Sequence, residues 1–458
     1  MKKISVLLTF VLVLALAVPA FAAEDNVKIT GEVKTIFEAG TYGDDDEAAV
    51  TLWADDDVLD LDNPFAGDGE GDMDDYYAEK AFYQEIDFAV AGMVNENITF
   101  DLAIDTLVNN FTNVESATYG DKLFGDQGED EDLKMDTALL TISDGVSTLK
   151  LGDVDDYAND VYFIDEEDME MMELSTKVSE NDLKVFVAGS EDFEDQDFYG
   201  VTLGRDLGAT TLTGKLYQSR YEGYAVSNFA VAADVEVSDM VTINGEVVAN
   251  SADKEFAGDA DRIKNNAEGD TAFFLGADVA VSDALTLNAK LESVGEEFVS
   301  VAGDLEEDYD YDLFTVGADY ALNDANTVGA AYTLVDHNEA EDKSTIELSL
   351  DNVTGAFTNT AAVAFTTNDG YAEDTDVTVI TLGTEYAMSK LTTISAKLVN
   401  QSADDYYDNE FTYLAAGLDH QISETVSWDT EARFITGEDK DEYDGEGSSL
   451  RTQLNVKF

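Results

Sequence analysis

The stretch FYQEIDFAVAGMVNENITFDLAID, residues 82–105, decides the fold class, because apolar and polar side chains alternate along both of its halves. A short polar turn at residues 94–97 separates the two alternating runs. Successive side chains of a β-strand point to opposite faces, so each run predicts a strand with one apolar and one polar face. The whole stretch therefore predicts a β-hairpin.

The same unit recurs along the chain, as two alternating runs of about eight to twelve residues around a short polar turn. Ten such hairpins, with single strands at residues 27–37 and 450–458, give 22 expected strands. Long acidic loops alternate with the short turns, which is typical of a transmembrane antiparallel up-and-down β-barrel with periplasmic turns and external loops. The alternative is a soluble exported β-sandwich or β-solenoid. The near absence of proline favours the barrel, whose ladder has no edges.

The first 22 residues differ from the rest of the chain. Two lysines precede an apolar run over residues 4–18, and an Ala-Phe-Ala cleavage site ends at residue 22. This order predicts a secretory signal peptide and leaves residues 23–458 as a single barrel domain. An uncleaved membrane helix is disfavoured because Pro19 ends the apolar run short of a full span.

The composition argues against several functions. With 100 Asp and Glu, 24 Lys and Arg and a net charge of -76, the chain is not expected to bind nucleic acid, whose phosphates need a basic surface. The absence of cysteine removes thiol nucleophiles, disulfides and cysteine zinc sites. His420 and Ser423 lack a matching acid, and no cofactor motif is visible, so we expect neither an enzyme nor a bound cofactor.

One acidic run resembles a metal site. Residues 68–79 place acids at positions 1, 3, 5 and 12 of a calcium-binding loop, but Met73 stands where the sharp turn needs glycine. We therefore expect loose binding of divalent cations by the acidic first loop rather than a specific metal site.

Charges sort between the two faces of the predicted strands. A Lys or Arg on the lipid face costs roughly 2 to 4 kcal/mol at the bilayer midplane, whereas a charge in a water-filled lumen is hydrated. Residues 224–422 are expected to form a mainly acidic lumen wall, and the strands before and after them a basic wall. Alternatively, the bases only pair with neighbouring acids. The expected basic wall consists of Lys28, Lys34, Lys134, Lys150, Lys177, Lys184, Lys215, Arg433 and Arg451.

Two segments carry a resemblance to a known family. Residues 450–458, LRTQLNVKF, place apolar residues at alternate positions before a final Phe458, and residues 145–153, GVSTLKLGD, resemble the strand before the third external loop of bacterial outer-membrane porins. The resemblance covers the architecture of the whole mature chain. It implies the outer membrane of a diderm bacterium, Phe458 as the signal read by the barrel-insertion machinery, and assembly as a homotrimer.

In porins the third external loop folds inward and narrows the channel, and the resemblance implies the same here. Asp153 departs from the family, which commonly has Arg at that position. Porins usually have 16 or 18 strands, so the expected range is 16 to 22. The resemblance places these acids at the constriction, facing the basic wall: Asp155, Asp156, Asp160, Asp165, Glu166, Glu167 and Asp168.

Together these features predict a porin that lets small hydrophilic solutes and ions diffuse passively through the outer-membrane lipid and that prefers cations. The alternative is a structural or surface-binding barrel whose acidic loops hold divalent cations. A solute-specific facilitator would need an aromatic track along the lumen, which the sequence does not reveal. The charge also predicts a saline or divalent-rich habitat, because about 1 M salt shortens the Debye length to roughly 3 Å.

Overall fold

The computed structural model describes residues 27–42, 80–108, 134–165, 167–190, 196–221, 224–253, 267–305, 309–337, 342–369, 375–403, 409–438 and 444–458. The expected signal peptide, residues 1–22, and the calcium-loop-like run, residues 68–79, lie outside these ranges. Among the described residues, no helix is long and apolar enough to cross a membrane.

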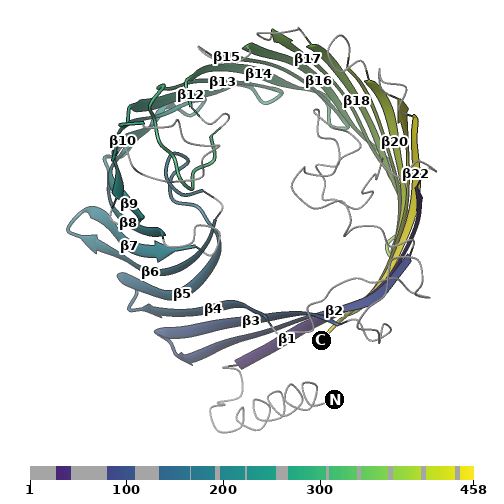
Figure 1. The fold of residues 1–458 in the computed structure, drawn as a ribbon, viewed down its shortest axis with the longest axis horizontal. Helices are drawn as coiled ribbons and strands as arrows, with labels where there is room; N and C mark the ends of the chain where they lie inside the picture. The colour runs from purple at the N-terminus through teal and green to yellow at the C-terminus, as the bar shows by residue number, and fades with distance from the viewer. Residues whose placement is uncertain are drawn as a thin grey trace.

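The described residues form 22 antiparallel strands in one closed sheet (Figure 1). Each strand pairs with the next along the chain, and β22 pairs with β1. The expected fold class and strand number are therefore confirmed. The strands are β1 Val27–Tyr42, β2 Lys80–Asn95, β3 Ile98–Val108, β4 Lys134–Ser143, β5 Ser147–Tyr157, β6 Glu167–Val178, β7 Asn181–Gly189, β8 Gln196–Asp206, β9 Thr210–Tyr221, β10 Tyr224–Ser238, β11 Val241–Ala252, β12 Thr271–Ser282, β13 Leu285–Val294, β14 Tyr311–Asn323, β15 Asn326–His337, β16 Asp342–Thr354, β17 Phe357–Asp369, β18 Thr375–Ser389, β19 Thr392–Ala403, β20 Asn409–Ser423, β21 Val426–Glu438 and β22 Asp444–Lys457.

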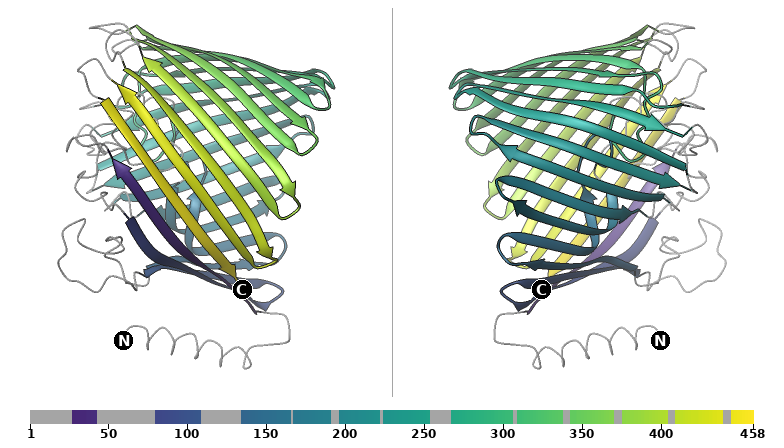
Figure 2. Two further views of the ribbon diagram at one scale, coloured as in Figure 1. Left: turned by 90° about the vertical axis from the view of Figure 1, so that its right-hand side faces the viewer. Right: turned by 90° about the vertical axis from the view of Figure 1, so that its left-hand side faces the viewer.

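Side chains alternate across the barrel wall as the sequence pattern predicts. On β9, Leu212 and Leu216 are exposed on the outside, whereas Lys215 and Tyr217 point into the lumen and are largely buried. Figure 2 shows the strands tilted relative to the barrel axis and the short turns gathered along one rim. A closed barrel satisfies all strand N–H and C=O groups within its own ladder, which a membrane requires.

The barrel closes where β22 meets β1. The Gly31 N–H donates to the Phe458 carbonyl and the Phe458 N–H donates to the Gly31 carbonyl, each at 3.0 Å. The Phe458 ring lies across Gly31, since a Cβ at Gly31 would lie 2.5 Å from the ring. Glycine at this position therefore makes room for the final aromatic residue.

Strand β5 leaves β4 at Gly152, the last residue of the β4–β5 ladder. Gly152 has a φ of 120°, and a Cβ there would lie 1.8 Å from the Ala138 carbonyl oxygen, so no other residue fits. Beyond this point the Ala138 N–H donates to the Asp153 carboxylate at 3.0 Å, in place of a backbone carbonyl of β5. Asp153, which departs from the porin pattern, thus holds the edge of β4 where β5 turns away.

Candidate functional site

Two segments lie inside the ring of strands, and we call them together the inner strap: residues 158–165, between β5 and β6, and residues 295–305, between β13 and β14. Ile164 forms a parallel bridge with Ala302, and the Asp165 N–H donates to the Ala302 carbonyl at 2.9 Å. In Figure 1 the strap lies within the barrel beside β10 and β12. The segment after β5 thus folds inward, bonded to a second inward segment.

An apolar core joins the inner strap to the lumen face of β7 to β9. Phe163 stacks on Tyr217 with ring centroids 4.7 Å apart and meets Phe198 edge-on at 5.8 Å. Phe186 and Phe198 are also buried at inward positions. Burial of each such side chain contributes about 1.5–3 kcal/mol, so these inward positions stabilise the strap instead of lining water.

A buried ion triad fixes the strap next to this core. The Lys215 ammonium lies 2.8 Å from the Asp160 carboxylate of the strap and 2.7 Å from the Glu246 carboxylate of β11. The exposed side-chain fractions are 12% for Lys215, 1% for Asp160 and 4% for Glu246, so the pairs are shielded from solvent. One ammonium neutralises two buried carboxylates, so Lys215 is the centre of the attachment.

Tyr162 forms the third attachment of the strap. Its hydroxyl donates to the Glu292 carboxylate at 2.8 Å, and its carbonyl accepts the Asn228 side-chain amide at 3.3 Å. Burial, and then the negative charge of Glu292, raise the pKa of the Tyr162 phenol, so the phenol stays neutral and remains a donor.

The expected constriction acids lie in different surroundings in the structure. Asp160 turns to the wall, whereas Asp155 is exposed and accepts a bond from the Thr137 hydroxyl at 2.9 Å. The exposed Asp168 carboxylate accepts the Asp156 N–H at 3.1 Å, which ties the base of the strap together. Asp165 joins the strap through its backbone, while Glu166 and the side chain of Glu167 lie outside the described residues.

Most of the expected basic wall is engaged in ion pairs with acids. Lys215 is buried in its triad, and Lys28 and Lys150 have no ion pair with any described residue. Arg451 borders a cavity with Asp429 and Glu431, and the side chain of Lys134 is outside the described residues. The remaining pairs are Lys34–Glu85 at 3.0 Å, Lys177–Asp182 at 2.8 Å, Lys184–Glu173 at 3.6 Å and Arg433–Glu431.

A row of acids lines the lumen on β10 to β20, across from the strands that carry the basic wall. That these acids share one depth was not predicted from the sequence. Six strands, every second one from β10 to β20, run toward a short turn, and each carries one inward carboxylate. This carboxylate lies four residues before the end of the strand, or three residues before it on β16. Four residues of strand span about 13 Å, so the six lie at a similar distance from the rim of short turns. This acid row consists of Asp234, Asp278, Asp319, Asp351, Glu385 and Asp419.

A glycine two residues before the acid could have revealed the row. The motif is LGAD at residues 275–278, VGAD at 316–319, LGTE at 382–385 and AGLD at 416–419. Each glycine lies under a polar side chain of the neighbouring strand: a Cβ on Gly276, for example, would meet the Asn244 amide oxygen at 2.3 Å. The glycines thus let polar side chains lie flat against the wall above the acids.

Among the described residues, no group of three or more His, Asp or Glu side chains is placed to hold a metal ion. The site is instead a closed barrel with a polar, charged interior, which defines the class of outer-membrane channels. The model of the Gram-negative porin family matches residues 197–440, more than half of the chain. The chain belongs to this family, and it is a protein of the outer membrane. Its family consists of channels, not enzymes.

The chain also aligns with solved structures at low sequence identity. OccK3 (OpdO) of Pseudomonas aeruginosa is 10% identical, with 96% of this chain and 97% of that chain covered and a TM-score of 0.41. The siderophore receptor PirA of Pseudomonas aeruginosa is 8% identical, with 94% and 80% covered and a TM-score of 0.45. A variant of OccD1 (OprD) is 9% identical, with 95% and 96% covered and a TM-score of 0.42. No curated protein matches the chain.

Proposed function

We propose that this porin is a passive diffusion channel for small hydrophilic solutes and ions that prefers cations. The acid row carries the proposal, because it places six carboxylates at a similar depth on the strands from β10 to β20. At the corresponding inward positions of β2, β4 and β8 stand the uncharged residues Ala91, Leu139 and Thr202. The neighbouring strands place Lys28 in register with Ala91, and Lys184 and Lys215 in register with Thr202; the last two are already paired with acids, so Lys28 alone of these bases opposes the six carboxylates.

The physical reason is the sign of the potential along the path. Rings of acidic side chains raise the local concentration of cations and lower that of anions. The exposed acids Asp155, Asp156 and Asp168 lie at the base of the inner strap. They make the potential more negative on the side of the lumen that the strap occupies. The basic wall opposes them weakly, since most of its members are already paired.

Reconstitution into planar bilayers under a potassium chloride gradient tests the proposal. We expect conductance steps and a reversal potential of the sign that marks cation preference. The triple variant Asp319→Asn, Asp351→Asn, Glu385→Gln should move the reversal potential toward zero while steps persist. A matched control, Asp239→Asn, Asp283→Asn, Asp324→Asn, removes three acids from short turns instead and should move it less. An anion-directed potential in the parent chain would refute the preference.

Three further features complete the proposal. Phe458 acts as the signal for the barrel-insertion machinery, and its position in the seam between β22 and β1 is consistent with a role late in closure. The chain assembles as a homotrimer, as porins often do, which cross-linking of the purified protein tests.

Its acidic loops bind divalent cations loosely and suit a saline habitat. Thermal stability measured at low and high salt tests this proposal.

A further inference from the structure

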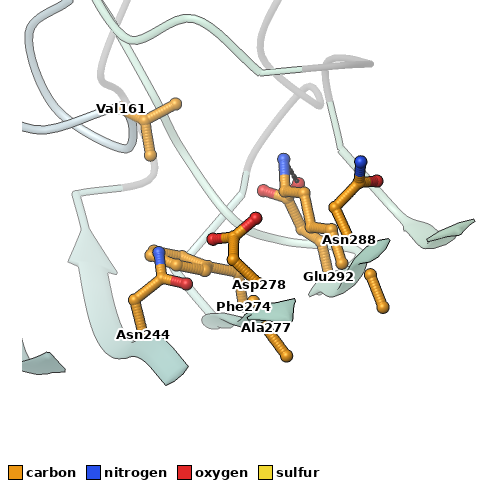
Figure 3. A pocket seen from close by; sticks show the side chains of 10 residues that line it. Val161, Asn244, Phe274, Ala277, Asp278, Asn288 and Glu292 are labelled. Carbon is orange, nitrogen blue, oxygen red and sulfur yellow. Dashed lines mark ion pairs between the residues drawn. The ribbon is translucent and has the colours of Figure 1, made fainter. Parts of the chain in front are cut away.

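A cavity of about 350 Å³ lies between the inner strap and the lumen wall of β11 to β13. Val161 of the strap borders one side, and the ring of Phe274 lies on the wall. Figure 3 shows the side chains of Asn244, Asp278 and Asn288 along the wall of this cavity, on three neighbouring strands. The cavity therefore has an apolar side and a polar side, at the depth of the acid row.

The polar side chains of this cavity are free to bind a solute. Asn244, Asp278 and Asn288 have no hydrogen-bond or ion-pair partner among the described residues. On the wall of β16 and β17, by comparison, Thr345 and Thr366 bond to each other at 3.0 Å. Three unpaired polar groups thus line one cavity.

The remaining charges of the cavity largely neutralise each other. The Lys290 ammonium lies 2.6 Å from the Glu292 carboxylate, which also accepts the Tyr162 hydroxyl at 2.8 Å. Glu292 is 2% exposed, so its charge is held by these two partners and is not open to a solute. Lys290 is about half exposed and keeps N–H groups directed to the lumen.

The balance of donors and acceptors selects the kind of solute. Each Asn amide offers two donors and an acceptor oxygen, Asp278 only accepts, and Lys290 only donates. A simple cation would use the acceptors alone, and an anion would meet carboxylates. A hydroxyl group both donates and accepts, so a solute with several hydroxyls uses every group on the polar side, while its C–H face fits against Phe274 and Val161.

We propose that this cavity is a weak binding subsite for small neutral polyhydroxylated solutes of about monosaccharide size, a proposal that rests on the channel function proposed above. A volume of about 350 Å³ lies at the lower end of the range for small-molecule sites, which suits a solute of about this size. Binding is weak because a permeating solute must also leave.

Single-channel recording with D-glucose tests the subsite. Glucose should interrupt the current in a concentration-dependent way, and Asn244→Ala with Asn288→Ala should raise the half-blocking concentration at least tenfold. The matched control Thr360→Ala with Ser395→Ala removes two polar side chains that lie over glycines elsewhere on the wall and should leave the glucose effect unchanged. Heat-modifiable gel migration verifies that each variant is folded.

The outcomes separate the two proposals. Conductance steps without a glucose effect, or with an effect that the Asn variant leaves unchanged, would overturn the subsite and leave the channel standing. Absence of steps in the parent chain would overturn the channel and the subsite with it. Block by ethanolamine but not by glucose, lost in Asp278→Asn, would overturn the polyol assignment in favour of a cation site. Glucose block that survives Asp278→Asn supports the polyol, because the amide keeps the acceptor.

Discussion

The lumen wall under the inner strap and the wall formed by β16 and β17 share one alternating pattern but have different interiors. Under the strap, the inward residues Phe186 and Phe198 are buried in an apolar core. On β16 and β17, the inward residues Glu347, Ser349 and Thr360 are polar and exposed. Alternation therefore tells which side chains point inward, and the loops decide whether those side chains meet protein or water.

The largest effect is expected from Lys215→Met, which removes the centre of the strap attachment. It leaves Asp160 and Glu246 buried without a counter-charge, and breaking such a buried pair costs about 3–5 kcal/mol. Because the chain has no cysteine, Ala302→Cys, at a strap position that is fully buried, can report strap release through its rate of labelling by a water-soluble maleimide. We expect labelling to accelerate at least about a hundredfold.

Lys177→Met is the matched control, since Lys177 and Asp182 are 65% and 61% exposed and such pairs contribute about 0–1 kcal/mol. It should change the labelling rate less than about fivefold. Equal rates in the two variants would show that the triad does not hold the strap.

The next effect is expected from Phe163→Ala, which leaves a cavity among Tyr217, Phe198 and Phe186. Such truncations of a packed core cost about 3–5 kcal/mol. Phe365→Ala, on the lipid side of β17, removes the same ring from a position where it is 46% exposed. Urea unfolding from lipid vesicles should show a clear loss for the first variant and a smaller one for the second; the reverse order would contradict a packed interior.

A smaller difference is expected when one hydroxyl is removed from each wall. Tyr162→Phe deletes the bond to the Glu292 carboxylate and should cost about 1.5–3 kcal/mol, as hydrogen bonds to charged groups do. Thr345→Val deletes the bond to Thr366 and should cost about 0.5–1.5 kcal/mol. Thermal midpoints in the same detergent compare the two with the parent chain, and a Tyr162→Phe midpoint equal to that of the parent would show that this bond adds nothing to strap docking.

The smallest effect is expected from a single member of the acid row on the uncovered wall. Asp351→Asn should shift the reversal potential by about one third of the shift of the triple variant, since well-separated charges act nearly additively. Folding and step size should stay at parent values. A shift as large as that of the triple variant would show that one residue, not the row, sets the preference.

Much of the fold could be predicted from the sequence, because the number of strands and their faces follow from local alternation. The inner strap was foreseeable only in part. Residues 161–164, VYFI, form an apolar run inside an acidic loop, which signals burial. Its partners were out of reach, since Tyr162 bonds to Glu292, 130 residues further on. Such contacts depend on barrel curvature and on a second inward loop.

The basic wall shows a second limit of sequence reasoning. Alternation along the strands placed the bases on the inward face, but strand register decides which acid stands beside each base. Lys34, for example, faces Glu85 across the β1–β2 ladder. The acid row, in contrast, was readable in the repeated glycine and acid two residues apart, once the distance to each short turn is counted.

The seam between β22 and β1 has a consequence for the order of assembly. Every other pairing joins strands that are neighbours in sequence and can form as a local hairpin or step, whereas this one joins the two ends of the described chain. Contacts of such long sequence separation form slowly. Until β22 arrives, both β1 and the most recently added strand expose unpaired N–H and C=O groups, which other chains can capture. A nascent barrel thus keeps two unpaired edges until its last strand is in place, and any delay at that strand prolongs the exposure of those edges to other chains.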